Sequence, residues 1–317
     1  MRSVLPGGRG RRRVTRGLAA IALPALAALL GASPASAATR DVWVAAVPKQ
    51  WNAVPNARDA LHGTSFVAAQ TTFPTVVYRR YTRGWKRPLR LAYEARGSIN
   101  GPLIRARVGD ELRIHFKNLD TLHEQAHSMH FHGVEYEPSS DGIWLPLFSG
   151  KGGNVKPGQS FTYRLTAGPG SAGFWPYHDH STSMEESIAG GMFGGLSIAG
   201  RRERRADREL VVAFAPWHGF QTVNGRAFVG NTPVFEARVG ESVQWNVMAM
   251  GDEFHTFHVH GHRWRTDGGV PEDTRGLGPA ESFRVRWRED APGTWLYHCH
   301  VEEHMRQGMI GLYKVRE

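Results

Sequence analysis

The chain has 317 residues with a formal net charge of +10, and its single Cys excludes a disulfide framework. Charged residues make up 21% of the chain and the hydrophobic set 41%, a balance that excludes disorder and is typical of folded globular proteins. Its 16 His and 10 Trp are the unusual feature, because the histidines are bunched and the only Cys lies inside a bunch. The length suffices for two domains of ordinary size.

Residues 1–37 have the pattern of a secretion signal. A basic region that ends at Arg16 precedes an apolar run from Leu18 to Leu30 and a small-residue cleavage pattern at 35–37. The run contains Pro24 and is shorter than the roughly 20 residues of a membrane span, so we expect removal and secretion rather than anchoring. The leader holds six of the 39 basic side chains and no acid, which leaves 33 against 29. A mature net charge of +4 weakens the case for nucleic-acid binding.

The remaining chain has no other long apolar run, so we expect no membrane span after signal removal. Short segments alternate apolar and polar residues, as at 112–116 and 282–287, with Gly and Pro between them. This alternation is typical of strands in β-sandwiches, and long helical patterns are absent. The sequence therefore predicts an all-β fold.

Segments of the first half recur in the same order in the second half. The matches are Ala106–Asp110 with Ala237–Glu241, His127–Gly133 with His255–Gly261, Pro157–Phe161 with Pro279–Phe283, and Tyr177–His180 with Tyr297–His300. Two homologous β domains are the economical interpretation, over residues 38–200 and 206–317. The charged stretch 201–205 between them is expected to be a solvated linker.

Four His-x-His pairs divide equally between the two halves. Residues two apart on a strand point to the same face, so each pair presents two imidazoles together. Eight convergent imidazoles exceed the four ligands of a structural zinc site and suit a cluster of several metals. The pairs are His130/His132, His178/His180, His258/His260 and His298/His300.

The last two pairs are accompanied by further ligand types. Cys299 lies between the two histidines of the last pair, so its sulfur points to the opposite face of a strand. His255 precedes His258 by three residues and is also placed opposite its neighbouring pair. His304 and Met309 follow Cys299 by five and ten residues. Two His, one thiolate and a weak axial Met are the ligands of a blue-copper electron-transfer site.

These motifs resemble those of multicopper oxidases, specifically the two-domain bacterial laccases (small laccases), over roughly residues 95–317. The resemblance implies two cupredoxin-like Greek-key β-sandwich domains and about four coppers per chain: one type 1, one type 2 and two type 3. The earlier segment, 42–81, is more similar to the start of a ceruloplasmin-type cupredoxin domain. By motif, the implied ligands are His255, Cys299, His304 and Met309 for type 1, His130 and His258 for type 2, His132, His178 and His300 for one type 3 copper, and His180, His260 and His298 for the other.

The first domain departs from the second at the type 1 position. Asp179 stands where the second domain has Cys299, and His127 matches His255 in spacing but has no Cys partner. We therefore expect no type 1 copper in the first domain and a structural role for His127. The remaining histidines, expected to be surface, packing or supporting residues, are His62, His115, His123, His218 and His262.

The resemblance implies laccase-like oxidation of phenols or aromatic amines, coupled to four-electron reduction of O2 to water. Electrons would enter at the His304 edge and pass from Cys299 into the histidines on either side of it. A homotrimer is implied, in which the first domain of one chain meets the second domain of the next and closes a ring. Because O2 reduction consumes protons, Asp141 and Glu302 are the implied proton donors near the cluster.

Three other functions stay open. A metallo-oxidase acting on Fe(II) or Cu(I) is favoured by the ceruloplasmin-like start. A copper nitrite reductase needs a mononuclear catalytic copper, and the full set of four histidine pairs counts against it. A non-enzymatic copper-binding protein would explain the histidines but not the Cys between two cluster ligands.

Overall fold

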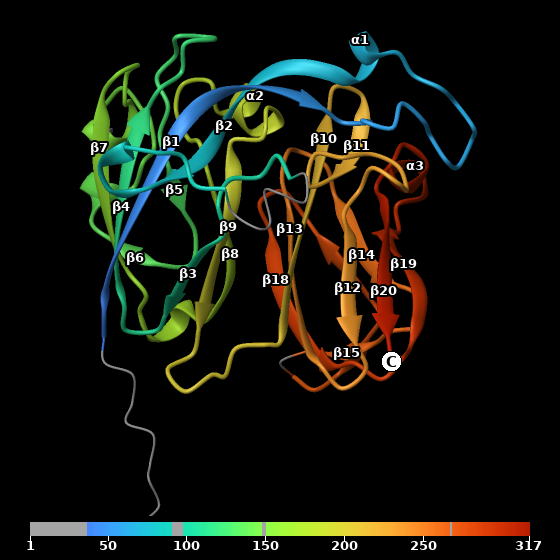
Figure 1. The fold of residues 1–317 in the computed structure, drawn as a ribbon. Helices are drawn as coiled ribbons and strands as arrows, with labels where there is room; N and C mark the ends of the chain where they lie inside the picture. Colours follow the sequence, from blue (N-terminus) through green and yellow to red (C-terminus); the bar gives the residue numbers. More distant parts are fainter. Residues whose placement is uncertain (1–36, 91–97, 148–149, 267) are drawn as a thin grey trace, which may run out of the picture. The chain divides into compact units, whose positions relative to one another are not determined.

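The described chain is mostly β-strand, which confirms the predicted all-β class (Figure 1). The computed structural model describes residues 37–90, 98–147, 150–266 and 268–317, so the predicted leader lies outside the described residues except for Ala37. The α-helices are short: α1 (Ala68–Thr71), α2 (Met184–Ala189) and α3 (Glu302–Arg306). None of the helices in the described ranges has the length and apolar character needed to cross a membrane.

Strands β1 to β9 form a first pair of sheets. One has the order β2 (Thr72–Tyr81), β1 (Thr39–Asn52), β4 (Glu111–Asn118), β7 (Ser160–Thr166) and β6 (Glu135–Tyr136). The other has the order β3 (Ile104–Arg107), β9 (Phe193–Ala199), β8 (Gly173–His178) and β5 (His130–Phe131). Buried and partly exposed side chains alternate along β4, as its sequence predicts, and the buried ones join a core that contains Phe116, Tyr163 and Tyr177.

Strands β10 to β20 form a second pair of sheets. Its first sheet has the order β11 (Phe220–Val223), β10 (Arg208–Trp217), β13 (Ser242–Ala249) and β18 (Ser282–Arg288). Its second has the order β12 (Val234–Arg238), β20 (Ile310–Arg316), β19 (Gly293–Cys299), β14 (His255–Val259) and β17 (Thr274–Leu277), and a small hairpin joins β15 (Trp264–Arg265) to β16 (Pro271–Glu272). The buried Trp245 lies in the core between them. The internal sequence repeat is therefore also a repeat of strand order over four strands of each sheet, and only the edge strands β6 and β17 differ, since they join non-equivalent sheets.

Apolar and charged contacts join the two sheet pairs. Phe174 and Phe193 of the first pair share a buried cluster with Met248 of the second. In the predicted linker, the Glu203 carboxylate accepts bonds from Arg284 and Arg286, at 3.2 and 2.8 Å. The linker is therefore tied to β18 at this residue rather than solvated throughout its length.

Candidate metal centres

A thiol and two imidazoles converge in the second sheet pair. Cys299 Sγ lies 3.8 Å from Nδ1 of His255 and 3.8 Å from Nδ1 of His304, and the two nitrogens are 3.1 Å apart. His255 begins β14, Cys299 ends β19 and His304 lies in α3, so three elements supply the site. We call His255, Cys299, His304 and Met309 the thiol site.

The chain between Cys299 and Met309 closes on itself. The Cys299 N–H donates to Met309 O at 3.1 Å, and the Met309 N–H donates to His304 O at 3.0 Å. Gly308 makes the return possible, since its φ is +123° and a Cβ there would lie 2.5 Å from Ala227 Cβ. Met309 is buried in the same core cluster as Cys299, and its carbonyl accepts the Cys299 N–H.

The chemistry of this donor set fits copper. Burial raises the pKa of the Cys299 thiol, and burial together with His304 lowers the pKa of His255 to about 4. The site without metal therefore favours a neutral imidazole and a protonated thiol, and a bound cation would displace the thiol proton. One soft sulfur with two imidazoles matches a copper or zinc preference, and a Met as a fourth ligand would favour copper.

An acidic side chain that sequence reasoning missed reaches the outer side of the thiol site. Glu253 Oε2 lies 3.1 Å from His304 Nε2, and the Glu253 side chain is 43% exposed. Asp252, next to it, is exposed. Both acids line a cavity of about 620 Å³ together with apolar side chains that include Met184, Ile188 and Met250. The same cavity is lined by His130, His132, His178 and His180.

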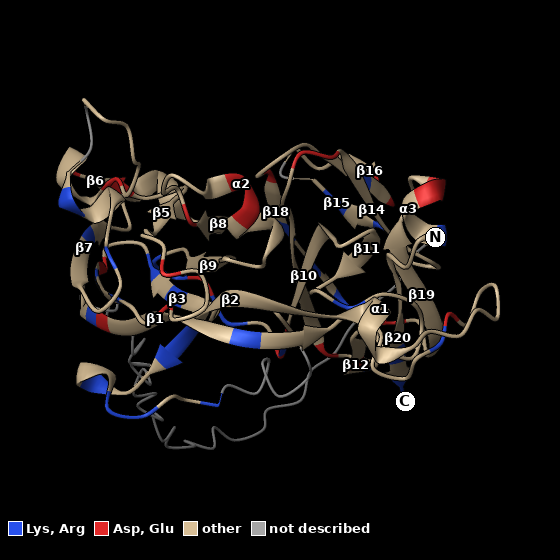
Figure 2. Ribbon diagram, turned by 90° about the horizontal axis from the view of Figure 1, so that it is seen from above, with Lys and Arg blue, Asp and Glu red and all other residues tan. Residues whose placement is uncertain are grey.

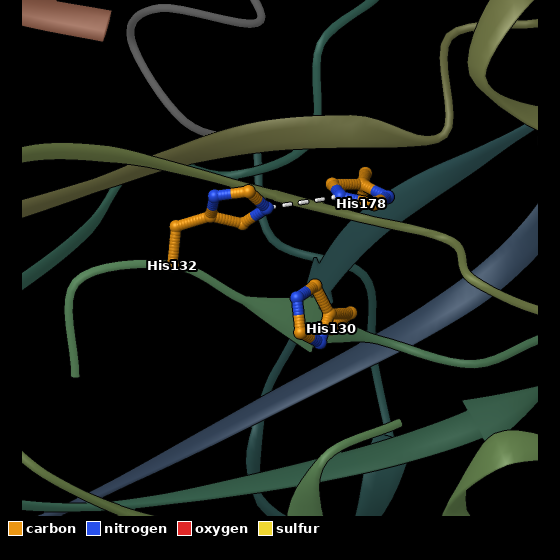
Figure 3. A group of neighbouring side chains, drawn as sticks. All are labelled: His130, His132 and His178. Carbon is orange, nitrogen blue, oxygen red and sulfur yellow. Dashed lines mark hydrogen bonds between the residues drawn. The ribbon is translucent and has the colours of Figure 1, made fainter. Parts of the chain in front are cut away.

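The two histidine pairs of the first sheet pair come together as predicted. In β5 and β8, His130 stands opposite His178 in the strand register. His132 Nε2 lies 3.1 Å from His178 Nε2, and Figure 3 shows these two rings with His130 beside them. The His130 ring is 5.3 Å from the His180 ring between centroids. These four residues are the first histidine set.

The second sheet pair repeats the arrangement. His258 stands opposite His298 in the register of β14 and β19, and His260 Nε2 lies 3.0 Å from His298 Nε2. The ring of His300 is 5.5 Å from that of His258. These four residues are the second histidine set, and within it His260 and His300 are exposed.

Backbone carbonyls orient the histidines in both sets. His178 Nδ1 donates to Asp179 O and His298 Nδ1 donates to Cys299 O, each at 2.9 Å. Such bonds fix the ring and leave Nε2 free to bind a metal. His130 and His258 are held in the same way, by Asp141 O at 2.8 Å and Asp273 O at 2.7 Å.

Burial, and then the neighbouring imidazoles, lower the pKa of His132, His178 and His298 to about 4. These rings are therefore neutral at neutral pH, which is the form that binds metal.

The two histidine sets do not meet within one chain. Across the described ranges, no hydrogen bond or ring contact joins a member of the first set to a member of the second. The implied type 2 site, His130 with His258, and both implied type 3 sites draw on the two sets together. The described chain therefore holds two separate sets of four imidazoles each.

The two acids implied as proton donors differ in their surroundings. Asp141 Oδ1 is 3.3 Å from His130 Nδ1, and Tyr136, which sequence reasoning missed, hydrogen-bonds to it. Burial and that bond raise the pKa of Tyr136 to about 12. Glu302 lies in the first turn of α3, a helix coloured partly red for its acidic residues in Figure 2. Its side chain is 75% exposed and lies 3.3 Å from the Arg306 side chain. Among the described contacts, none joins it to His300.

The other histidines have partners that suit packing or support, except His123, which is exposed. The contacts are His62 with Asp59, His115 with Asp41 and Trp43, His127 with Asp120 and Asp179, His218 with Phe73, and His262 with Glu289.

Known proteins resemble this chain in sequence and fold. Residues 89–203 and residues 203–317 each match a family profile described as multicopper oxidase. The human protein named Ferroxidase HEPHL1 is 28% identical over 346 residues, which cover 87% of this chain and 29% of that protein. A protein of Kuenenia stuttgartiensis, named a probable nitrite reductase-hydroxylamine oxidoreductase fusion protein, is 31% identical over 245 residues, which cover 69% of this chain and 28% of that protein. This chain thus spans less than a third of the length of these curated relatives.

A solved structure described as a multicopper oxidase has a TM-score of 0.66 to this chain at 26% sequence identity, over 87% of this chain and 89% of that one. This likeness confirms the predicted cupredoxin-like Greek-key β-sandwiches.

Proposed function

Because the chain belongs to the multicopper oxidase family, we propose that it is a copper-dependent oxidase that takes electrons from small reducing substrates and reduces O2 to water. The position of Cys299 carries this proposal. Its sulfur faces His255 and His304 at 3.8 Å, while its two neighbours in the chain belong to the second histidine set. Copper at such ligands supplies one-electron transfer and reaction with O2.

The chain itself provides a short covalent route between the two kinds of site. Cys299 is bonded directly to both His298 and His300, and its carbonyl accepts the His298 Nδ1–H at 2.9 Å. Cys299 therefore belongs to one metal centre, and His298 and His300, which point to the opposite side of the chain, belong to another.

The first test is the copper content and its spectra. About four coppers per chain, with intense blue absorption and a magnetically coupled pair, is the expected result. A single blue copper with one uncoupled copper would support a nitrite reductase type of site. Copper without blue absorption would support a storage protein.

We propose laccase-like oxidation of phenols or aromatic amines as the first candidate activity. Glu253 lines a cavity whose other walls are the apolar side chains of Met184, Ile188 and Met250, which suit an aromatic ring, and the four histidines of the first set. The Glu253 carboxylate, 3.1 Å from His304 Nε2, is placed to accept the proton that a phenol releases when it is oxidised.

A metallo-oxidase is the second candidate, and the carboxylates near His304 favour it. Glu253 contacts His304 of the thiol site at 3.1 Å, and the neighbouring Asp252 lines the same cavity as Glu253. Carboxylate oxygens bind hard cations such as Fe(II). The human relative is named a ferroxidase.

One kinetic experiment separates the two candidates. Oxygen uptake is recorded with a phenol, Fe(II) and Cu(I) for the wild type, Glu253→Gln and a control, Glu236→Gln. Glu236 is an exposed, ion-paired glutamate at 3.0 Å from Arg316, away from the thiol site. A loss of Fe(II) turnover alone in Glu253→Gln identifies a metallo-oxidase, and a loss confined to the phenol identifies a laccase. No oxygen uptake from any donor by the copper-loaded wild type would refute the oxidase.

We also propose that the active protein is a homotrimer in which each cluster is shared between chains. The exposure of His260 and His300 and the separation of the two histidine sets support it, because a partner's first set would complete the second set. Leu147 is 89% exposed in a loop anchored by the Trp144 N–H to His180 O, which suits burial by that partner. Light scattering that shows a fully copper-loaded, active monomer would contradict this assembly.

A further inference from the structure

The first sheet pair has a hydrogen-bonded network at the place that the thiol site occupies in the second. The Asp179 N–H donates to Met192 O at 3.0 Å, as the Cys299 N–H donates to Met309 O at 3.1 Å. His127, at the position that matches His255, bonds the Asp179 side chain through Nδ1 at 3.0 Å. Position by position, a carboxylate stands where the second sheet pair has a thiol.

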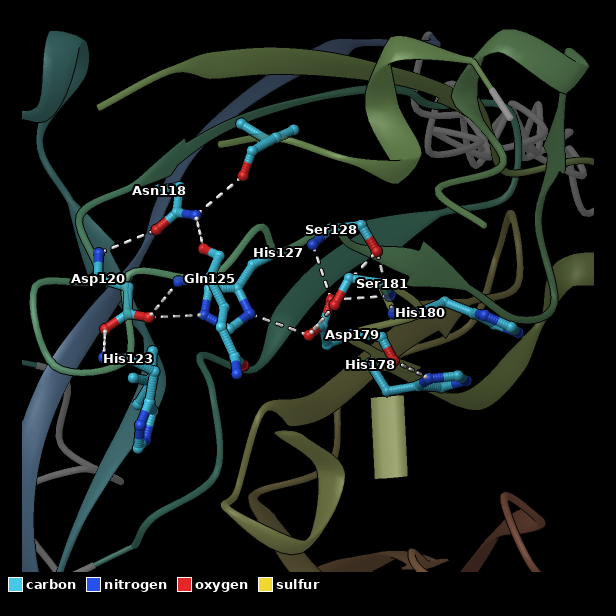
Figure 4. A network of polar contacts seen from close by, with 12 residues as sticks. Asn118, Asp120, His123, Gln125, His127, Ser128, His178, Asp179, His180 and Ser181 are labelled. Carbon is cyan, nitrogen blue, oxygen red and sulfur yellow. Dashed lines mark hydrogen bonds and ion pairs between the residues drawn. The ribbon is translucent and has the colours of Figure 1, made fainter. Parts of the chain in front are cut away.

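The Asp179 carboxylate is fully buried and accepts bonds from every side (Figure 4). Oδ1 accepts the Ser128 N–H at 2.7 Å and the Ser181 N–H at 3.2 Å, and Oδ2 accepts the Ser181 hydroxyl at 2.8 Å. The second ring nitrogen of His127, Nε2, lies 3.2 Å from Asp120 Oδ2. Asp120 in turn accepts backbone N–H groups of its own loop, from Leu122 at 2.8 Å among others.

Both nitrogens of His127 are therefore occupied by carboxylates. Burial lowers the pKa of this ring, but the bonds and charges of Asp179 and Asp120 outweigh burial and raise it. An imidazolium with two carboxylate partners has no lone pair to offer a metal. The arrangement is satisfied by hydrogen bonds within the protein, whereas Cys299 Sγ and the Nδ1 atoms of His255 and His304 lie within 3.8 Å of one another and form a set of metal-ligand atoms.

The network joins the two segments that carry the first histidine set. Ser128 lies two residues before His130, and its hydroxyl accepts the His180 N–H at 3.0 Å. Asp179 lies between His178 and His180, and its carbonyl orients the His178 ring. The start of β5 and the end of β8 are thus bonded to each other through Asp179 and Ser128.

We propose that Asp120, His127 and Asp179 are positioning residues that hold the first histidine set in its ligating geometry without metal, the task that a bound copper performs for the second set. The proposal rests on the proposed function, because it takes His178 and His180 as copper ligands. The two histidine sets then differ in how they are held. Hydrogen bonds hold the first set before any metal binds, and the second set becomes rigid when copper binds the thiol site.

Hydrogen exchange on the copper-free wild type tests the preformed state directly. Amides of Ser128, His180 and Ser181 should exchange at the same slow rate with and without copper. Amides of Thr256, His300 and Met309, around the thiol site, should exchange at least tenfold faster when copper is removed. Equal acceleration in both groups on copper removal would overturn the proposal.

Asp179→Asn tests the residues. The variant should keep one blue copper per chain, lose at least half of the coupled copper, and show at least tenfold faster exchange at Ser128 and Ser181 in the copper-free protein. Asp110→Asn is the matched control: Asp110 is a buried aspartate in the same sheet pair that accepts the Arg107 N–H at 2.9 Å and the Ala38 N–H at 3.1 Å. It should leave both readouts unchanged.

Ser181→Ala removes one bond to Asp179 and serves if Asp179→Asn does not fold. It should give the same changes with smaller amplitude. Wild-type coupled copper with wild-type exchange in these variants would refute the positioning role, whereas a wild type that never loads the coupled pair would refute the proposed function itself.

Discussion

Replacing Glu289 by Gln should destabilise the protein strongly, because this carboxylate is buried and serves several donors. Glu289 is 1% exposed and accepts His262 Nε2 at 3.0 Å, Trp287 Nε1 at 3.0 Å and the Tyr313 hydroxyl at 2.5 Å. Its counterpart in the first sheet pair is Ala167, so the fold itself does not require an acid here. Glutamine keeps the size of the side chain and removes the charge.

The magnitude follows from the pKa of this carboxyl. Burial raises it, but the bonds from His262, Tyr313 and Trp287 prevail and lower it to about 2. Against about 4.3 in the unfolded chain, the difference corresponds to roughly 3 kcal/mol of stability. Breaking a buried charged pair by removing one partner costs about 3–5 kcal/mol, in agreement. For a chain of 317 residues, the melting temperature should fall by about 4–5 °C.

The sign of the pH dependence follows from the two groups. The Glu289 contribution, from a lowered pKa, is present above about pH 4.3 and is lost as the pH falls through about 2. The pKa of His262 is raised, because its bonds to Glu289 and to His260 O outweigh burial. The His262 contribution is therefore present below about pH 6.5 and is lost as the pH rises through its raised value. The deficit of Glu289→Gln should be largest at about pH 5–6.

Urea unfolding of copper-free wild type and variant at pH 3, 5.5 and 9 measures this deficit. Glu209→Gln is the matched control, since Glu209 is bonded to Arg105 at 2.6 Å but to no histidine, so its deficit should persist at pH 9. The reasoning would be refuted if Glu289→Gln lowered the free energy of unfolding by less than about 1 kcal/mol at pH 5.5. It would also be refuted if the loss were no smaller at pH 3 or at pH 9 than at pH 5.5.

Three further variants test the proposed centres. Cys299→Ser should abolish the blue absorption and substrate oxidation while the coupled copper still loads, because all the proposed histidine ligands remain; visible spectra and copper analysis decide, and a variant that stays blue would rule out Cys299 as a ligand. Asp141→Asn should slow reoxidation by O2 by on the order of 10²-fold and leave reduction by substrate unchanged, because its carboxyl lies 3.3 Å from His130 Nδ1. Stopped-flow measurement of both half-reactions checks this, and Glu302→Gln, which alters an exposed acid paired with Arg306, should have the smaller effect.

The sequence alone predicted what depends on strand periodicity and on the internal repeat. A spacing of two residues places each histidine pair on one face of a strand, and the structure pairs β5 with β8 and β14 with β19 so that the pairs meet. The same period places Cys299 opposite its neighbours, where it meets His255 and His304. These features are local, so they can be read from order and spacing.

Only the tertiary structure decided which distant side chains complete the sites. Glu253 meets His304 across 51 positions of sequence, and Asp120 meets His127 inside a buried network; neither carboxylate has a motif of its own. Glu302 shows the converse, because its closeness to His300 in sequence does not become a described contact once α3 turns its side chain toward Arg306. Loop and helix residues are placed by packing and by hydrogen bonds to remote backbone, which no periodicity in the chain records.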